Sequence, residues 1–192
     1  KNLQSFGQTV VIAFNKFATD TDEEIEVLRK HCEEMGCGFA VNSAFAEGGK
    51  GAMELAELVV KTIDERPSAP LYFAYDDNDT IEEKIEKVAF NLYGAGSVTL
   101  SDSAKAMIEE IKKLGAEKFP ICIAKTQYSF STDAKAYGPT EGFELHVRDI
   151  TVNMGAEMIV VIAGPIMRMP GLPKSPQAER IDVVNGEITG LS

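Results

Sequence analysis

Two aromatic side chains stand where a flat ligand could be held. Phe17 follows the apolar run Thr9–Phe14, whose β-branched residues are typical of a strand buried on both faces of a parallel sheet. Phe45 follows a second short strand predicted over Gly38–Asn42. Loops at the carboxyl ends of parallel strands converge on ligands. Two facing rings at such ends would form a clamp for a planar ligand.

The pair Asn15-Lys16 directly precedes the first ring and could contact a nucleotide. Such a pair at a strand end resembles the base-reading segment of P-loop nucleotide hydrolases. The aspartate that would complete a guanine-reading pattern is replaced by Ala18, so guanine specificity is not expected. The simpler alternative is that Asn15 only holds a turn while Phe17 packs against the following helix.

Two lysines could bind an anion. Lys50 lies in Gly48-Gly49-Lys50-Gly51, but a Walker A loop requires a glycine where this chain has Ala44 and a hydroxyl where it has Gly51. We interpret this stretch as a turn that starts a helix, with anion binding by a helix amino end as the alternative. Lys125 ends a strand predicted over Ile121–Ala124, where it either reaches an anion or is simply solvated.

The segment Met167–Lys174 contains Pro170, Gly171 and Leu172 and follows a strand predicted over Met158–Ala163. Its prolines and glycine exclude a helix and a central strand, so it must be a defined loop. This loop either forms one wall of a pocket or only routes the chain.

No metal site is expected. His31, Cys32 and Cys37 lie close together, but the only other histidine is His146 and there is no Cys-x-x-Cys pair. We interpret Cys32 as a core residue. A cluster of aspartates lacks the spacing of a calcium loop and is interpreted as the solvated start of a helix: Asp76, Asp77 and Asp79.

The elements that must position these residues alternate between strand and helix. Capping boxes at Thr21/Glu24 and Thr80/Glu83 start two helices, and Ser101 caps another. A further strand is predicted over Leu71–Tyr75. The final third is strand-rich and ends in a hairpin around Asn185-Gly186. The pattern predicts an α/β fold with a mostly parallel sheet and flanking helices.

Composition restricts the partners. The 192 residues carry a formal net charge of -11, which argues against a broad nucleic-acid surface, and no apolar run approaches the roughly 20 residues of a membrane span. Three cysteines without a secretory segment favour a reducing cytosol. We expect one α/β region over 1–192, with possible sub-lobes 1–66, 67–119 and 120–192.

Four separated segments, in order along the chain, resemble the later part of formate–tetrahydrofolate ligases. They are Val10–Thr21, Phe45–Gly51, Pro120–Ser129 and Ile166–Lys174. The resemblance covers essentially the whole chain. It implies a fragment from the carboxy-terminal end of a larger, P-loop-NTPase-related enzyme, which is cytoplasmic and homo-oligomeric. A start at Lys1 rather than at Met fits a piece of something longer.

The family uses ATP and Mg²⁺ to make formyl phosphate from formate, which the N10 nitrogen of tetrahydrofolate then attacks. The resemblance implies folate binding by Phe17 and by Phe45, which stands where the family usually has tryptophan. It also implies places near the nucleotide for five residues: Asn15, Lys125, Pro170, Gly171 and Leu172. The family's Walker-type loop and formate-handling residues lie upstream.

This chain is therefore expected to contain no catalytic residue, to bind none of these small molecules tightly alone and to be inactive in isolation. Ala18 departs from the proline that is usual in the family. The alternative is a non-catalytic module that binds folate or mediates oligomerisation.

Overall fold

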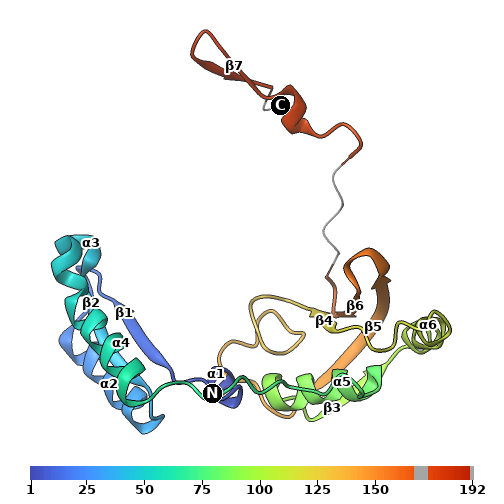
Figure 1. Ribbon diagram of the computed structural model, residues 1–192, viewed down its shortest axis with the longest axis horizontal. Coiled ribbons are helices and arrows are strands. Elements are labelled where there is room, and N and C mark those ends of the chain that lie inside the picture. The colour runs from blue at the N-terminus through green and yellow to red at the C-terminus, as the bar shows by residue number, and fades with distance from the viewer. Residues whose placement is uncertain (167–172, 191–192) are drawn as a thin grey trace. The chain divides into compact units, whose positions relative to one another are not determined.

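A computed structural model describes residues 1–166 and 173–190 (Figure 1). The chain divides into two compact units, Lys1–Leu92 and Tyr93–Ser192. Strands and helices alternate along the chain, and the sheets are mixed, so the expected α/β class is confirmed. The sub-lobe boundaries expected from the sequence stay a prediction.

The first unit contains a two-stranded parallel sheet. Strand β1 (Val11–Asn15) pairs in register with β2 (Gly38–Asn42), so that Asn15 lies opposite Asn42 at the carboxyl ends of both strands. The remaining elements of this unit are mostly helical: α1 (Asn2–Ser5), α2 (Asp22–Glu34), α3 (Ala44–Glu47), the 3-10 helix η1 (Gly48–Ala52), α4 (Met53–Glu65), α5 (Ile81–Val88) and the π-helical turn η2 (Ala89–Tyr93), which runs into the second unit.

Helix α2 begins and packs as its sequence predicts. The Thr21 side chain accepts a hydrogen bond from the Glu24 backbone N–H, and the Glu24 carboxylate accepts one from the Thr21 backbone N–H, which completes a capping box. Cys32 on this helix is buried beside Ile25 and Phe39, with Phe14 packed against the cluster. The interpretation of Cys32 as a core residue is confirmed.

Strand β1 is less covered than expected. A strand buried on both faces was predicted, yet Ile12 is 38% exposed and Ala13 and Asn15 are exposed as well. Within the described residues β1 has β2 as its only strand neighbour. A continuous apolar run needs neighbours on both edges and both faces to be buried, and this two-stranded sheet supplies only part of them.

The segment Leu71–Tyr75 is not a strand, so that prediction is wrong. The backbone N–H of Tyr72 donates a hydrogen bond to the carbonyl of Phe6. The Tyr72 ring lies against Gly7, where an added Cβ would come within 2.8 and 2.9 Å of two ring carbons. Tyr72 thus holds an irregular connection in place, while the Leu71 and Phe73 side chains are exposed. The bonding partner of Tyr72 is a loop rather than a sheet edge.

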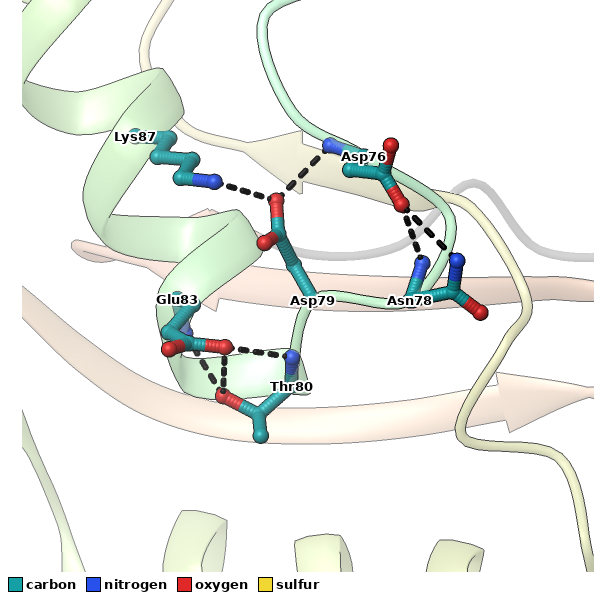
Figure 2. A network of polar contacts seen from close by, with 6 residues as sticks. All are labelled: Asp76, Asn78, Asp79, Thr80, Glu83 and Lys87. Carbon is teal, nitrogen blue, oxygen red and sulfur yellow. Dashed lines mark hydrogen bonds and ion pairs between the residues drawn. The ribbon is translucent and has the colours of Figure 1, made fainter.

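The start of α5 is a dense polar network (Figure 2). Thr80 and Glu83 form the predicted capping box. Just before it, a carboxylate oxygen of Asp79 accepts from the Asp76 backbone N–H at 2.7 Å and from Lys87 Nζ at 2.6 Å. The interpretation of this acidic cluster as merely solvated was wrong for Asp79, because its side chain is only 15% exposed and is tied to the helix that follows.

The second unit is built on a four-stranded mixed sheet of order β3-β5-β6-β4. Only the central pair, β5 and β6, is antiparallel. Its elements are β3 (Ser97–Leu100), α6 (Asp102–Lys113), β4 (Ile121–Ala124), β5 (Glu144–Asn153), the 3-10 helix η3 (Met154–Ala156), β6 (Met158–Ala163), the 3-10 helix η4 (Gln177–Arg180), β7 (Asp182–Val184) and β8 (Glu187–Thr189).

This unit also carries its own core and hairpin. The core consists of apolar side chains from α6, β5 and β6: Ala104, Ile108, Ile111, Leu145, Val147, Ile150, Ile159 and Val161. Strands β7 and β8 pair antiparallel around Asn185-Gly186, both with positive φ, so the predicted hairpin is confirmed. Among residues 1–166 and 173–190, no helix combines the length and apolar character needed to cross a bilayer.

Candidate functional site

Phe17 and Phe45 lie on the loops that leave two adjacent parallel strands. Phe17 comes two residues after the end of β1 and is 64% exposed. Phe45, in the short helix α3 that follows β2, is 95% exposed. The alternative in which Phe17 packs against the next helix would cover only a minor part of this ring. Both rings are available to a ligand at the same end of one small sheet.

The loop that carries Phe17 is held by its own polar groups. The Phe17 backbone N–H donates to a carboxylate oxygen of Asp20 at 2.8 Å, and Lys16 Nζ lies 3.3 Å from Asp22. The Lys16 backbone N–H donates to the carbonyl of Asn42, which extends the pairing of the two strands by one step. The ring of Phe17 is thus carried on a braced turn.

Asn15 does more than hold a local turn. Its Oδ1 accepts a hydrogen bond from Asn42 Nδ2 at 2.8 Å across the two strand ends. The Asn42 Oδ1 accepts from the backbone N–H of Ala44 at 3.2 Å, next to Phe45. Sequence reasoning missed Asn42, although the argument that singled out Asn15, a polar residue at the carboxyl end of a parallel strand, applies equally to it.

The stretch Gly48-Gly49-Lys50-Gly51 forms the 3-10 helix η1, which leads directly into α4. This confirms the interpretation as a turn that starts a helix. Gly51 is its tightest point, since a Cβ there would lie 2.5 Å from the carbonyl carbon of Ser43 and 2.9 Å from the Ala44 nitrogen. Gly51 therefore serves a close approach of two backbone segments, whereas an added Cβ at Gly48 or Gly49 would meet no atom within 4 Å.

A separate pocket of about 660 Å³ opens in the second unit, after β4. Its volume is typical of small-molecule sites. Lys125 lies in its wall, and the other residues that line it are Tyr93, Ile123, Thr126, Gln127, Tyr128, Ser129, Phe130, Gly138 and Pro139. Tyr93 and Phe130 were not singled out from the sequence, because their rings reach the pocket only through tertiary folding.

Lys125 is not a solvated strand-end lysine. Its Nζ donates to the carbonyls of Thr126 and Ser129 and lies 4.9 Å from the ring centroid of Tyr93 and 5.9 Å from that of Phe130. Burial lowers the pKa of this ammonium below its ordinary value. An ammonium engaged with carbonyls and rings shapes the wall of this pocket.

The predicted site residues fall into separate parts of the molecule. Asn15, Phe17 and Phe45 belong to the first unit and Lys125 to the second. Pro170, Gly171 and Leu172 lie outside the described residues. Within residues 1–166 and 173–190, no group of three histidine, cysteine or acidic side chains is arranged to hold a metal ion.

Comparison with known proteins places this chain in one family. The family model for formate–tetrahydrofolate ligase matches residues 1–192. A formate–tetrahydrofolate ligase of Phocaeicola vulgatus is 64% identical over 192 residues, and one of Bacteroides fragilis is 62% identical over 192 residues; each comparison covers the whole of this chain and 35% of the relative. A Campylobacter curvus ligase is 48% identical over 191 residues, or 98% of this chain and 34% of the relative.

The chain thus spans about a third of the length of the curated relatives that it matches. The matched region includes the two strand-end loops and the Lys125 pocket, because it spans residues 1–192. On this evidence the chain belongs to the formate–tetrahydrofolate ligase family.

Proposed function

We propose that this chain is the carboxy-terminal part of an ATP-dependent ligase that formylates tetrahydrofolate with formate. The chain would supply walls for folate and nucleotide, and a Walker A loop elsewhere in the longer protein would hold the phosphates. The observation that carries the proposal is the exposure of Phe17 and Phe45, 64% and 95%, on loops that leave adjacent parallel strands. Membership in the family supports it.

Two exposed rings suit the recognition of a pterin-type ring. A flat bicyclic ligand buries much area against an aromatic face, and stacked pairs gain about 0.5 to 1.5 kcal/mol beyond that burial. Placement at the carboxyl ends of parallel strands agrees with where ligands bind in open α/β sheets. Phe17 and Phe45 are therefore proposed as the folate-binding residues of this chain.

Nucleotide-proximal roles are proposed separately for Asn15 in the first unit and Lys125 in the second, and for Pro170, Gly171 and Leu172, which lie outside the described residues. For Lys125 the support is its place in the wall of the pocket after β4. The proposal assigns Mg²⁺, together with the phosphate-binding loop, to the remaining two thirds of the longer protein.

The reaction itself needs groups beyond this chain. Formate attacks the terminal phosphate of ATP, which yields formyl phosphate and ADP, and the N10 nitrogen of tetrahydrofolate then takes the formyl group and releases phosphate. The chain's own proposed part is to bind and orient the folate ring. A cytoplasmic, homo-oligomeric parent enzyme is proposed with it.

Calorimetric titration with tetrahydrofolate tests the folate role. The wild-type chain should bind weakly, and Phe17→Ala should lower the affinity by about tenfold, the scale of one lost stacking partner. Absence of binding by both proteins would refute a folate site in this chain. Equal affinities of both proteins for tetrahydrofolate would retain the folate site but show that Phe17 is not part of it.

The second candidate is a non-catalytic module that binds folate or mediates oligomerisation. It is favoured by the location of both rings within one compact unit, Lys1–Leu92, so that a ring site would not require the second unit. Sedimentation of the chain alone, with and without tetrahydrofolate, separates the two functions. A stable oligomer that forms without folate would favour the assembly role.

A further inference from the structure

The two loops that carry Phe17 and Phe45 are joined by a single hydrogen bond between side chains. Asn42 Nδ2 donates to Asn15 Oδ1 at 2.8 Å, between residues that lie opposite each other in the parallel register. The backbone pairing of Lys16 with Asn42 accompanies it. The side-chain bond therefore sits at the base from which both loops diverge.

The orientation of the Asn42 carboxamide is fixed by a second contact. The backbone N–H of Ala44 can only donate, and it points to Asn42 Oδ1 at 3.2 Å. The oxygen of Asn42 must therefore face Ala44, which leaves its Nδ2 as the donor to Asn15. One side chain thus fastens the Phe45 turn and connects it to the Phe17 loop.

Gly51 closes the Phe45 turn from the other side. Its carbonyl accepts from the Ser43 backbone N–H at 2.9 Å, and an added Cβ would lie 2.5 Å from the Ser43 carbonyl carbon. Any side chain at this position must push the backbone of Ser43 and Ala44 away. The direction of the neighbouring Phe45 ring depends on that backbone.

We propose that Asn15, Asn42 and Gly51 are positioning residues that set the spacing between the Phe17 and Phe45 rings. The inference rests on the proposed folate role of these rings. A pair of rings carried on two loops needs such a support, because sites on loops are less precise than sites on helices or strands unless supporting residues lock their geometry. The carboxamide pair links the two loops at their bases, and Gly51 sets the outward turn.

Two aspartate variants separate the hydrogen bond from the charge. Asn42→Asp keeps the acceptor for Ala44 but replaces the donor to Asn15 with an oxygen, so the bond between the loops is lost. Asn15→Asp keeps an acceptor for Asn42 Nδ2 and makes the bond charge-assisted. Each variant adds one negative charge, and the two positions are neighbours, so both variants should repel an anionic folate to a similar extent. A difference between them therefore reports on the hydrogen bond.

The sequence offers a clean spectroscopic reporter, because the chain contains no tryptophan. Phe45→Trp places one indole at the ring position itself. In this background, Asn42→Asp should lower the fluorescence anisotropy of the indole and weaken tetrahydrofolate binding by about three- to tenfold, the effect of one lost hydrogen bond. Asn15→Asp should keep the anisotropy, since its bond persists, and any loss of affinity that it shows measures the effect of the added charge alone.

Two further variants cover a failure of Asn42→Asp to fold, which thermal unfolding would reveal. Asn15→Leu breaks the same bond from an exposed position, and Gly51→Ala displaces the turn through the backbone of Ser43 and Ala44 while both asparagine side chains are retained. Both should lower the indole anisotropy as Asn42→Asp does. Rigid indoles in all of these variants would overturn the positioning role.

The failures of the two proposals are distinguishable. If the Phe45→Trp protein binds no tetrahydrofolate, the folate role fails, while the anisotropy series still judges the spacing role. If it binds and the affinity depends on Phe17, but Asn42→Asp and Asn15→Asp behave alike, only the positioning role is overturned.

Discussion

Phe45 is a single residue that combines an exposed aromatic ring with a firmly held backbone. A phenylalanine that is 95% exposed contributes almost nothing to a core, and its loop is nevertheless fastened by Asn42 and Gly51. Single exposed apolar side chains are common on protein surfaces. A braced one on a segment that leaves the strand next to that of a second exposed ring, Phe17, is consistent with the proposed ligand that covers both.

Replacement of Phe45 by tryptophan is a test of ring area at this position. A larger aromatic face should raise the affinity for tetrahydrofolate by no more than about 1 to 2 kcal/mol, whereas Phe45→Leu should lower it, since leucine has no stacking face. Calorimetry measures both. Equal affinities of the tryptophan, phenylalanine and leucine forms would show that no ring stacks on this side chain.

Lys125 should matter for the shape of its loop. Lys125→Met removes the donor to the Thr126 and Ser129 carbonyls and the contact with the Tyr93 ring, so the free energy of unfolding should fall by about 1 to 2 kcal/mol. Urea unfolding provides the measurement. The exposed Lys135→Met is the control, and a loss no larger than that of the control would contradict the structural role of Lys125.

At the scale of elements, the start of α5 makes a prediction about pH. The hydrogen bond from Lys87 is the main reason that the pKa of Asp79 lies below its ordinary value of 3.8, and the Asp76 backbone N–H adds to it. A carboxyl group whose pKa is lowered by folding stabilises the folded protein at pH values above its unfolded-state pKa. This stabilisation is lost as the pH falls through the pKa of the folded state. The contribution of Asp79 should therefore be complete near neutral pH.

Asp79→Asn should destabilise the protein near pH 7, and the difference from wild type should shrink as the pH falls below about 3.8. Urea unfolding over a pH series measures it. Asp77→Asn, at an exposed neighbour, controls for the general effect of one charge. A difference that stays constant into acid would mean that Asp79 acts through packing rather than ionisation.

Local signals predicted the elements better than they predicted pairing. The capping boxes at Thr21 and Thr80 and the Asn185-Gly186 turn are decided by residues within a few positions of each other, and all three are confirmed. Strand β3 (Ser97–Leu100) was missed because four residues carry little pattern and β3 exists through its pairing with β5. Leu71–Tyr75 failed in the opposite way, since its apolar pattern lacked a strand partner.

The candidate site divides in the same manner. Phe17 and Phe45 could be singled out because each directly follows a predicted strand. The bond between Asn15 and Asn42 requires the parallel register, which the sequence does not state. The Tyr93 and Phe130 rings around Lys125 come from segments more than 30 residues apart, and no local pattern brings them together.

At the scale of the whole molecule, the chain corresponds to about a third of its relatives. A mixture of the chain with ATP, Mg²⁺, formate and tetrahydrofolate should yield no 10-formyl product, because the proposal assigns phosphate and formate handling to the other two thirds. The same assay on a full-length ligase of the family is the positive control. Measurable turnover by the chain alone would contradict this division of labour.

The central claim is that both rings act on one ligand, and a double-mutant cycle measures this most directly. Tetrahydrofolate affinities are compared for wild type, Phe17→Ala, Phe45→Ala and the double variant, with Phe73→Ala as the control at a ring that is 79% exposed. We predict a loss of about tenfold for each single variant, little change for the control and a coupling of at least about 0.5 kcal/mol. Additive losses, or single variants that bind like the control, would contradict the claim.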